Sequence, residues 1–460
     1  MNLEMEYKQS AFQGIIGVAE TDITPPEGIY MGNWGAAISP VSTGTHRPLL
    51  MTCLTFQSKQ SDEPMVLIGL DLGWWKDSSD EMIIRQAILH QTGIGAQNLL
   101  MCLSHTHSGP SLSRRDADKP GGHLVNPYLD DLVKKAVRLI DSALKGAEES
   151  VLMWEYGHCN LAQNRDLRDP ENDRFLVGFN PDKKGDDTLL CGLVSDIQGR
   201  PRAIIVNYAC HPTTLGWGNT LISPDFPGVM KEVVSQEMNV PVLYIQGASG
   251  DLAPRINYSS DLKVPEKYGK QLGFAVLSTL ESITTPGHRL SFQGSVESGA
   301  PLAIWKEEEF NMPGSIRASQ YLISYRIKDI PTYQELEDQW EYCSDSVEKE
   351  RLWRKMGIRK ALGDGAEAEI SLWIWKLGTA FIVAQPNEAY SELQMDVRVM
   401  FPDRAIVVGN LVNGSYGYLA PKEFRDQNIY TVWQSPFEIG SLDVLKETII
   451  QSIVKQEETP

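Results

Sequence analysis

Apolar runs and amphipathic segments alternate along the first half of the chain. Continuous apolar runs are typical of buried strands, and apolar residues that recur every three or four positions are typical of helices. The predicted strands are 14–23, 50–57, 65–72, 98–104, 203–210 and 240–246, and the predicted helices are 79–91, 126–145 and 227–237. This recurring β-α-β order predicts an α/β fold of mixed β-sheets with flanking helices.

The segment 332–362 differs from its surroundings because it is rich in Glu, Gln, Lys, Arg and Trp at helical spacing. It predicts a charged helical insertion, which is either a solvated hairpin over the core or a lid or channel wall beside a substrate. After it, 369–377 and 379–384 predict a β-hairpin around Gly378, and 405–412 predicts a buried strand. The sequence shows no internal repeat or linker, so we expect residues 1–460 to form a single large domain.

Composition narrows the classes of function. The chain has 460 residues, with 42 Lys and Arg against 60 Asp and Glu, which gives a net charge of −18. Nucleic-acid and anionic-membrane partners need clustered basic residues, so neither is expected. No apolar run approaches the roughly 18 residues of a membrane span. The polar N-terminus lacks the apolar segment of a secretory signal peptide, so we expect a cytoplasmic protein. The oligomeric state stays open.

The strongest chemical motif is His105-Thr-His107-Ser-Gly-Pro, which follows the predicted strand 98–104. Side chains at i and i+2 lie on one face of a strand, and α/β sheets place their functional sites at the carboxyl ends of strands. A pair of hydrogen-bonded core histidines is the alternative explanation.

Three more predicted strands end in residues of similar chemistry. The run 203–210 leads into His211, 240–246 leads into Gly250-Asp251, and 379–384 leads into Glu388. Histidine and carboxylate side chains that converge at one edge suit a zinc ion. The sequence lacks the H-E-x-x-H, G-x-S-x-G, P-loop and dinucleotide-binding motifs, so the corresponding enzyme classes are not indicated.

Taken in order, these motifs resemble the neutral/alkaline, non-lysosomal ceramidases. The resemblance covers about residues 14–440 and rests on these segments: Gly17-Val-Ala-Glu-Thr-Asp-Ile-Thr24, His46-Arg47, Leu70-Asp-Leu-Gly73, His105-Thr-His-Ser-Gly-Pro110, Gln163-Asn-Arg165, His211, Leu221-Ile-Ser-Pro-Asp225, Gly250-Asp-Leu-Ala-Pro254, Pro386-Asn-Glu388, and Asn413 with Tyr416, Tyr418 and Tyr430. It implies the catalytic, N-terminal domain of that family.

The resemblance also implies a ligand set, and the chemistry of the residues around it suggests a mechanism as a hypothesis. One zinc ion would be held by His105, His211, Glu388 and Tyr418. A zinc-activated water would cleave an amide (N-acyl) or ester bond of a small-molecule substrate. His107 would carry a proton to the leaving amine, and Tyr430 or Arg165 would stabilise the oxyanion. A carboxylate from Asp71, Asp225 or Asp251 would orient the ring N–H groups of the histidines.

Two departures from the family pattern bear on the substrate. Ala253 stands where the family has the serine of its G-D-x-S-P motif. The sequence ends soon after the tyrosine segment, so we also expect no C-terminal immunoglobulin-like domain of the kind that the family carries. We therefore expect a ceramidase-like hydrolase with a non-ceramide substrate. The alternatives are a genuine neutral ceramidase and a non-catalytic metal- or ligand-binding relative.

The shape of the site should show whether the substrate is ceramide or another small molecule. A long apolar channel would favour ceramide, and a shallow polar or aromatic pocket would favour another substrate. Five tryptophans near the site segments are candidates for an aromatic wall: Trp34, Trp74, Trp75, Trp217 and Trp305.

Overall fold

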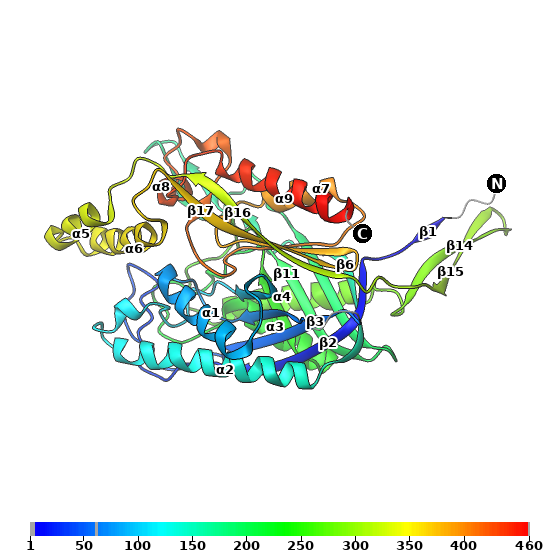
Figure 1. Ribbon diagram of the computed structural model, residues 1–460. Coiled ribbons are helices and arrows are strands. Elements are labelled where there is room, and N and C mark those ends of the chain that lie inside the picture. The colour runs from blue at the N-terminus through cyan, green and yellow to red at the C-terminus, as the bar shows by residue number, and fades with distance from the viewer. Residues whose placement is uncertain (1–4, 60–62, 459–460) are drawn as a thin grey trace.

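Two β-sheets lie face to face in the centre of the molecule, with helices on both outer sides (Figure 1). The structure is a computed structural model that describes residues 5–59 and 63–458. The larger sheet has the strand order β12-β11-β10-β6-β2-β3-β4-β5, formed by β2 (Ala11–Asp22), β3 (Leu50–Gln57), β4 (Met65–Leu70), β5 (Leu99–Leu103), β6 (Glu148–His158), β10 (Thr188–Asp196), β11 (Pro201–Tyr208) and β12 (Val242–Gln246). The smaller sheet has the order β16-β17-β18-β20, formed by β16 (Ile316–Arg326), β17 (Glu367–Leu377), β18 (Ala380–Ala384) and β20 (Ile406–Gly409).

Apolar side chains fill the space between the sheets and under the helices. The layer between the sheets includes Phe56, Leu100, Ile245, Trp373 and Trp375, all buried. The outer face of the larger sheet is covered by α1 (Ser78–Thr92), α2 (Val125–Lys145), α3 (Asp225–Met238) and α4 (Lys263–Leu280). The outer face of the smaller sheet is covered by α7 (Glu392–Met400) and α9 (Ser441–Glu458). The predicted α/β class with mixed sheets and flanking helices is confirmed.

The larger sheet curls so that its two edges meet. Strands β5 and β12 lie at opposite ends of the strand order, yet β12 contacts both β4 and β5. Gly69 of β4 makes this approach possible, because a Cβ there would lie 2.9 Å from Cγ of Leu243 in β12. Strong twist is expected of long sheets. The curl brings the carboxyl end of β5 close to the carboxyl ends of β11 and β12.

Two parts of the chain project from this body at opposite ends of the view in Figure 1. One is a small sheet of β1 (Glu6–Tyr7), β14 (His288–Glu297) and β15 (Pro301–Glu309). The other is a helical hairpin of α5 (Tyr333–Tyr342) and α6 (Ser346–Leu362), at the position of the predicted insertion. Helix α6 packs against α1.

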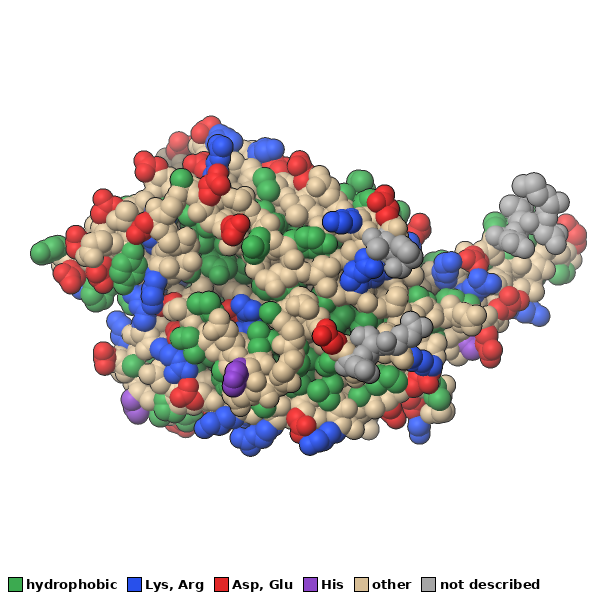
Figure 2. Space-filling model, in the orientation of Figure 1, with side chains coloured by type: hydrophobic (Ala, Val, Ile, Leu, Met, Phe, Trp, Pro, Cys, Tyr) green, Lys and Arg blue, Asp and Glu red, His purple; other side chains and the backbone are tan. Residues whose placement is uncertain are grey.

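Acidic and basic side chains are interspersed over the face shown in Figure 2. Among the described helices, none combines the length and apolar character needed to cross a membrane.

Candidate metal centre

His105 lies just beyond the end of β5, in a turn of unusual backbone geometry. The N–H groups of Ser104 and His105 donate to the carbonyls of Leu70 and Leu72, both at 2.8 Å, so the chain stays tied to the β4 side of the sheet. His105 has a φ of +70°, which is uncommon for a residue other than glycine. Strained backbone of this kind concentrates at functional sites, where the surrounding structure holds it in place.

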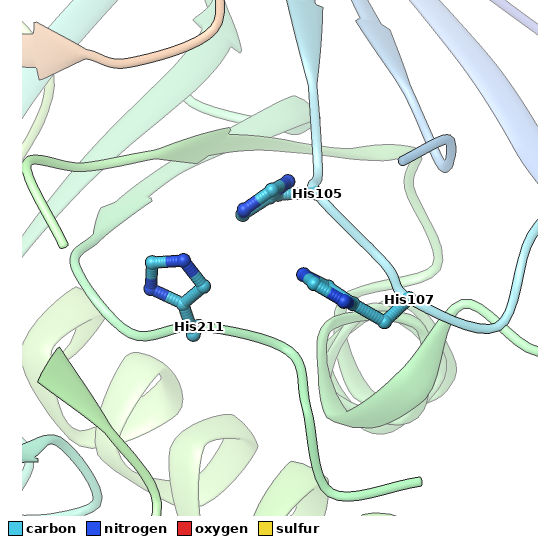
Figure 3. A group of neighbouring side chains, drawn as sticks. All are labelled: His105, His107 and His211. Atoms are coloured by element: carbon cyan, nitrogen blue, oxygen red, sulfur yellow. The ribbon is translucent and has the colours of Figure 1, made fainter. Parts of the chain in front are cut away.

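Three histidine rings come together at this point (Figure 3). One ring nitrogen from each of His105, His107 and His211 lies within 4.8 Å of the others. Glu388 adds a carboxylate: its Oε2 lies 3.1 Å from Nε2 of His105 and 3.0 Å from Nε2 of His211. The strand ends after β5, β11 and β18 therefore converge, and side chains far apart in the sequence meet at one place.

The hydrogen bonds of His211 show why a cation fits there. Its Nδ1 lies 2.7 Å from the carbonyl of Ser249 and therefore carries the ring proton. Its Nε2 then has a lone pair, yet this lone pair faces the carboxylate oxygen of Glu388 at 3.0 Å. Two acceptors at this distance repel each other unless a cation or proton lies between them. A nitrogen, a second nitrogen and a carboxylate oxygen are ligands that zinc takes readily.

The charge states of these groups also suit a metal. Burial, together with the positive charge of Arg165, lowers the pKa of His211 to about 3. Burial acts to raise the pKa of Glu388, but His105 and His211 outweigh it and hold that pKa well below its ordinary value. Neutral imidazole and ionised carboxylate are the forms that bind metal ions.

Backbone carbonyls orient the two histidine rings. Nδ1 of His211 also lies 3.2 Å from the carbonyl of Leu252, and Nδ1 of His105 lies 3.4 Å from the carbonyl of Gly73. The expectation that a nearby aspartate would do this is wrong. In the described residues these carboxylates have other partners: Asp71 accepts from Lys231, Asp225 accepts from Thr214, and Asp251 accepts from Ser391. Turns at the strand ends already place peptide carbonyls behind the rings, so no carboxylate is needed there.

Tyr418 lies beside Glu388 because of a short strand pairing. Strands β19 (Glu388–Ala389) and β21 (Tyr418–Leu419) are parallel, with Glu388 directly opposite Tyr418. The Tyr418 ring stacks with His211 at a centroid distance of 6.4 Å, and the Tyr430 ring lies 5.6 Å from the Tyr418 ring. Tyr430 begins the short helix α8 (Tyr430–Gln434). That Tyr418 is a metal ligand stays a prediction.

Arg165 is a buried cation next to Tyr418. Its Nε and Nη2 donate to the carbonyl of Gly250, at 3.1 and 2.8 Å, and Nη2 also donates to the Tyr418 hydroxyl at 3.3 Å. The residue pattern alone gave no sign of this position, and only the family resemblance indicated it. Asp251 follows Gly250 in the chain. The carbonyls of Ser249, Gly250 and Leu252 accept from His211 and Arg165, so this segment supports the site through its backbone and not through the Asp251 carboxylate.

His107 has no hydrogen-bond partner for either ring nitrogen within the described part of the chain, although both nitrogens are buried. Its ring contacts those of Trp34 and Trp74, at centroid distances of 5.0 and 4.7 Å. Burial and the neighbouring His105 and His211 lower its pKa well below 6.5. Buried polar atoms rarely lack a partner, so this ring is placed to meet a metal, a water or a substrate.

Comparison with known proteins concerns the fold. No protein-family model matches the chain. The neutral ceramidase from Pseudomonas aeruginosa has a similar structure, with a TM-score of 0.66 and 14% identity over 96% of this chain and 74% of that one. A ceramidase complexed with C2 is also similar, with a TM-score of 0.69 and 14% identity over 98% of this chain and 76% of that one. The chain has a neutral-ceramidase-like fold. This agrees with the resemblance carried by the sequence motifs.

A small cavity of about 70 Å³ opens beside the histidines of this ceramidase-like fold. Helix α6 forms one of its walls through Arg354 and Ile358, so the charged insertion lies against the candidate site. The remaining lining comes from residues around the metal centre and the tyrosines: Trp74, Trp75, Lys76, His105, His107, Glu388, Ser415, Gly417, Tyr418, Tyr430 and Gln434.

The five tryptophans predicted near the site differ in their position relative to the cavity. Trp74 and Trp75 line the cavity, and Trp34 packs on His107. Trp217 extends this cluster outward, with its ring 6.1 Å from that of Trp34. The expectation that Trp305 belongs to the same wall is wrong, because it packs on Phe292 in the projecting sheet of β14 and β15.

Proposed function

We propose that the protein is a zinc-dependent hydrolase that cleaves an amide or ester bond in a small substrate other than ceramide. The observation that carries the proposal is the convergence of His105, His211 and Glu388, with a carboxylate oxygen 3.0–3.1 Å from two imidazole nitrogens. Tyr418 lies opposite Glu388 in the short strand pair and is the fourth candidate ligand.

A zinc ion held there would polarise the substrate carbonyl and lower the pKa of water toward about 7. Among the described residues neither ring nitrogen of His107 has a partner, and His107 takes the proton from the attacking water. It then passes this proton to the leaving nitrogen or oxygen as the bond to the carbonyl carbon breaks. Arg165 and Tyr430 lie beside Tyr418 and are the donors for the developing oxyanion.

The cavity favours a substrate other than ceramide through the side chains around it. Its lining is mostly aromatic and polar, and Ile358 is the single aliphatic side chain among the described lining residues. A lipid with two long chains would need a much longer apolar surface. Ala253 is buried and offers no hydroxyl group for a role in catalysis.

The experiment that tests the proposal combines metal analysis with a substrate panel. Wild-type protein should hold one zinc per chain and hydrolyse short-chain N-acyl compounds or esters faster than a ceramide. His105→Ala and Glu388→Ala should lose both zinc and activity. His158→Ala is the matched control, because His158 is exposed and pairs only with Asp187 in the described structure. Full zinc occupancy in both site variants would defeat the ligand assignment, and a preference for ceramide would defeat the substrate assignment.

A further inference from the structure

Helix α6 presents one arginine to the cavity beside the metal centre. The Arg354 guanidinium lies 5.8 Å from the centre of the Trp74 ring. The same ring contacts His105 and His107 at centroid distances of 5.6 and 4.7 Å. The cation and both imidazoles therefore contact the same indole ring. This spacing suits a short molecule whose scissile bond lies at the histidines and whose other end reaches Arg354.

Arg354 is only loosely held by its protein partners. Its Nε lies 3.1 Å from the carboxylate of Glu350, one turn earlier on α6, and both side chains are partly exposed to solvent. Its Nη2 lies 3.5 Å from the carbonyl of Asn33, at the limit of a hydrogen bond. Ion pairs between neighbours on a helix that keep contact with solvent stabilise little. An incoming anion can therefore compete with Glu350 for the guanidinium.

The other charged groups of the cavity lining are already engaged. Lys76 donates to the carbonyl of Gly32 at 2.8 Å and lies 3.7 Å from Asp116. Glu388 is shared between two histidines. Arg354 is thus the cation best placed to meet a ligand, and its planar fork matches the two oxygens of a carboxylate.

We propose that Arg354 selects substrates that carry a carboxylate close to the scissile bond, so that the substrate class is N-acyl amino acids rather than neutral N-acyl amino alcohols. This inference rests on the proposed hydrolase function, because it names the substrate of that same site. Glu350 holds the guanidinium in place in the free protein and gives way to the substrate carboxylate.

The first test compares N-butyrylglycine with N-butyrylethanolamine, which differ in the anionic group. Arg354→Gln should lower the ratio of their kcat/KM values by about 10- to 100-fold, mainly through KM for N-butyrylglycine, because a charge-assisted hydrogen bond is lost. Arg354→Lys should restore part of the ratio, and Glu350→Gln should raise it. Arg351→Gln is the matched control, since it removes the same charge from α6 at a residue that pairs with Glu348. An unchanged ratio in Arg354→Gln would overturn the inference.

The second test separates this inference from the proposed function. The ketone 4-oxoheptanoate has the shape and charge of N-butyrylglycine with CH₂ in place of the scissile NH, so it cannot be hydrolysed. Calorimetry should show that it binds the wild-type protein more tightly than the neutral 7-hydroxyheptan-4-one does, and that Arg354→Gln removes this difference. If neither N-acyl compound is hydrolysed but the binding difference follows Arg354, the hydrolase proposal fails and the anion site stands. Equal binding of the two ketones to wild-type protein would overturn the anion site.

Discussion

The two sides of the candidate site are built in different ways. On the sheet side, His105, His211 and Glu388 are buried at strand ends, and peptide carbonyls orient the histidine rings. On the helix side, the described contacts of α6 with the rest of the molecule include long side chains and one close backbone approach at Gly357. Arg115 lies 4.5 Å from the centre of the Trp353 ring, and Lys360 lies 3.3 Å from the carboxylate of Asp77.

This difference predicts that metal binding depends on the sheet side and substrate selectivity on the α6 side. Orientation by backbone carbonyls follows from the path of the chain, so single side-chain changes around the rings leave it in place. Surface ion pairs contribute little, about 0–1 kcal/mol, and the Lys360 partner of the pair with Asp77 is half exposed. Substitutions on α6 can therefore alter which substrate fits while the metal centre stays intact.

The largest effect is expected on the sheet side. His211→Ala removes one proposed ligand and leaves the Glu388 carboxylate buried with His105 as its imidazole partner among the described residues. Zinc content should fall far below one per chain, and hydrolysis should fall to background. Metal analysis of the purified variant measures this directly. Normal zinc content with lost activity would show that His211 acts in the chemistry but does not bind the metal.

A change beside the metal ligands should slow turnover and spare the metal. Tyr430→Phe removes a hydroxyl group at the cavity and keeps the ring packed on Tyr418. We expect kcat to fall by about 10²- to 10³-fold, as for loss of one oxyanion donor, with zinc content unchanged. Tyr342→Phe is the control, because Tyr342 is exposed on α5. Unchanged kcat in Tyr430→Phe would remove Tyr430 from the mechanism.

A change on α6 should act through the shape of the cavity. Gly357 lets α6 approach the chain at Lys76, since a Cβ there would lie 2.5 Å from the Lys76 carbonyl oxygen. Gly357→Ala should push the helix outward and lower the free energy of unfolding by about 1–3 kcal/mol. It should change KM across the substrate panel while zinc content stays at one per chain. Gly178→Ala is the control, because a Cβ at Gly178 meets no atom within 4 Å. Zinc loss in Gly357→Ala would show that the two sides are not separable.

The smallest effect on turnover is expected for Asp166, which lies next to Arg165 in the chain. Burial and the charge of Asp251 raise the pKa of Asp166 to about 7. The unfolded chain releases this proton near pH 4 and the folded protein only near pH 7, so stability falls as the pH rises between these values. Asp166→Asn should remove this loss and raise the free energy of unfolding by up to about 4 kcal/mol at pH 8, and by less at pH 5. Denaturant unfolding at both pH values checks this, and a gain independent of pH would contradict it.

Much of the local structure could be predicted from the sequence, because buried strands leave continuous apolar runs. The strand 50–57 is found at the predicted residues, and α2 begins within one residue of its predicted start. Strands β6 and β10 were not predicted; Glu155 interrupts the apolar pattern of the first, and Gly192 interrupts that of the second. These two strands complete the larger sheet between β2 and β11.

The residues of the candidate site could be predicted from the sequence, but their arrangement in space could not. His105, His211 and Glu388 stand out because each follows an apolar run, and apolar runs are visible in the sequence. Their meeting depends on the curl of the larger sheet, a long-range property that no local pattern encodes. Peptide carbonyls cannot be recognised in a sequence, because every residue has one. The residue types therefore predict an aspartate such as Asp251 behind the histidine rings, where the structure has carbonyls.

The most direct test of the metal centre is an anomalous difference map from crystals of the active enzyme, recorded at the zinc absorption edge. The account predicts one peak about 2.0–2.2 Å from Nε2 of His105, Nε2 of His211 and a carboxylate oxygen of Glu388. An active enzyme whose zinc peak lies away from these three residues, or is missing, would contradict it.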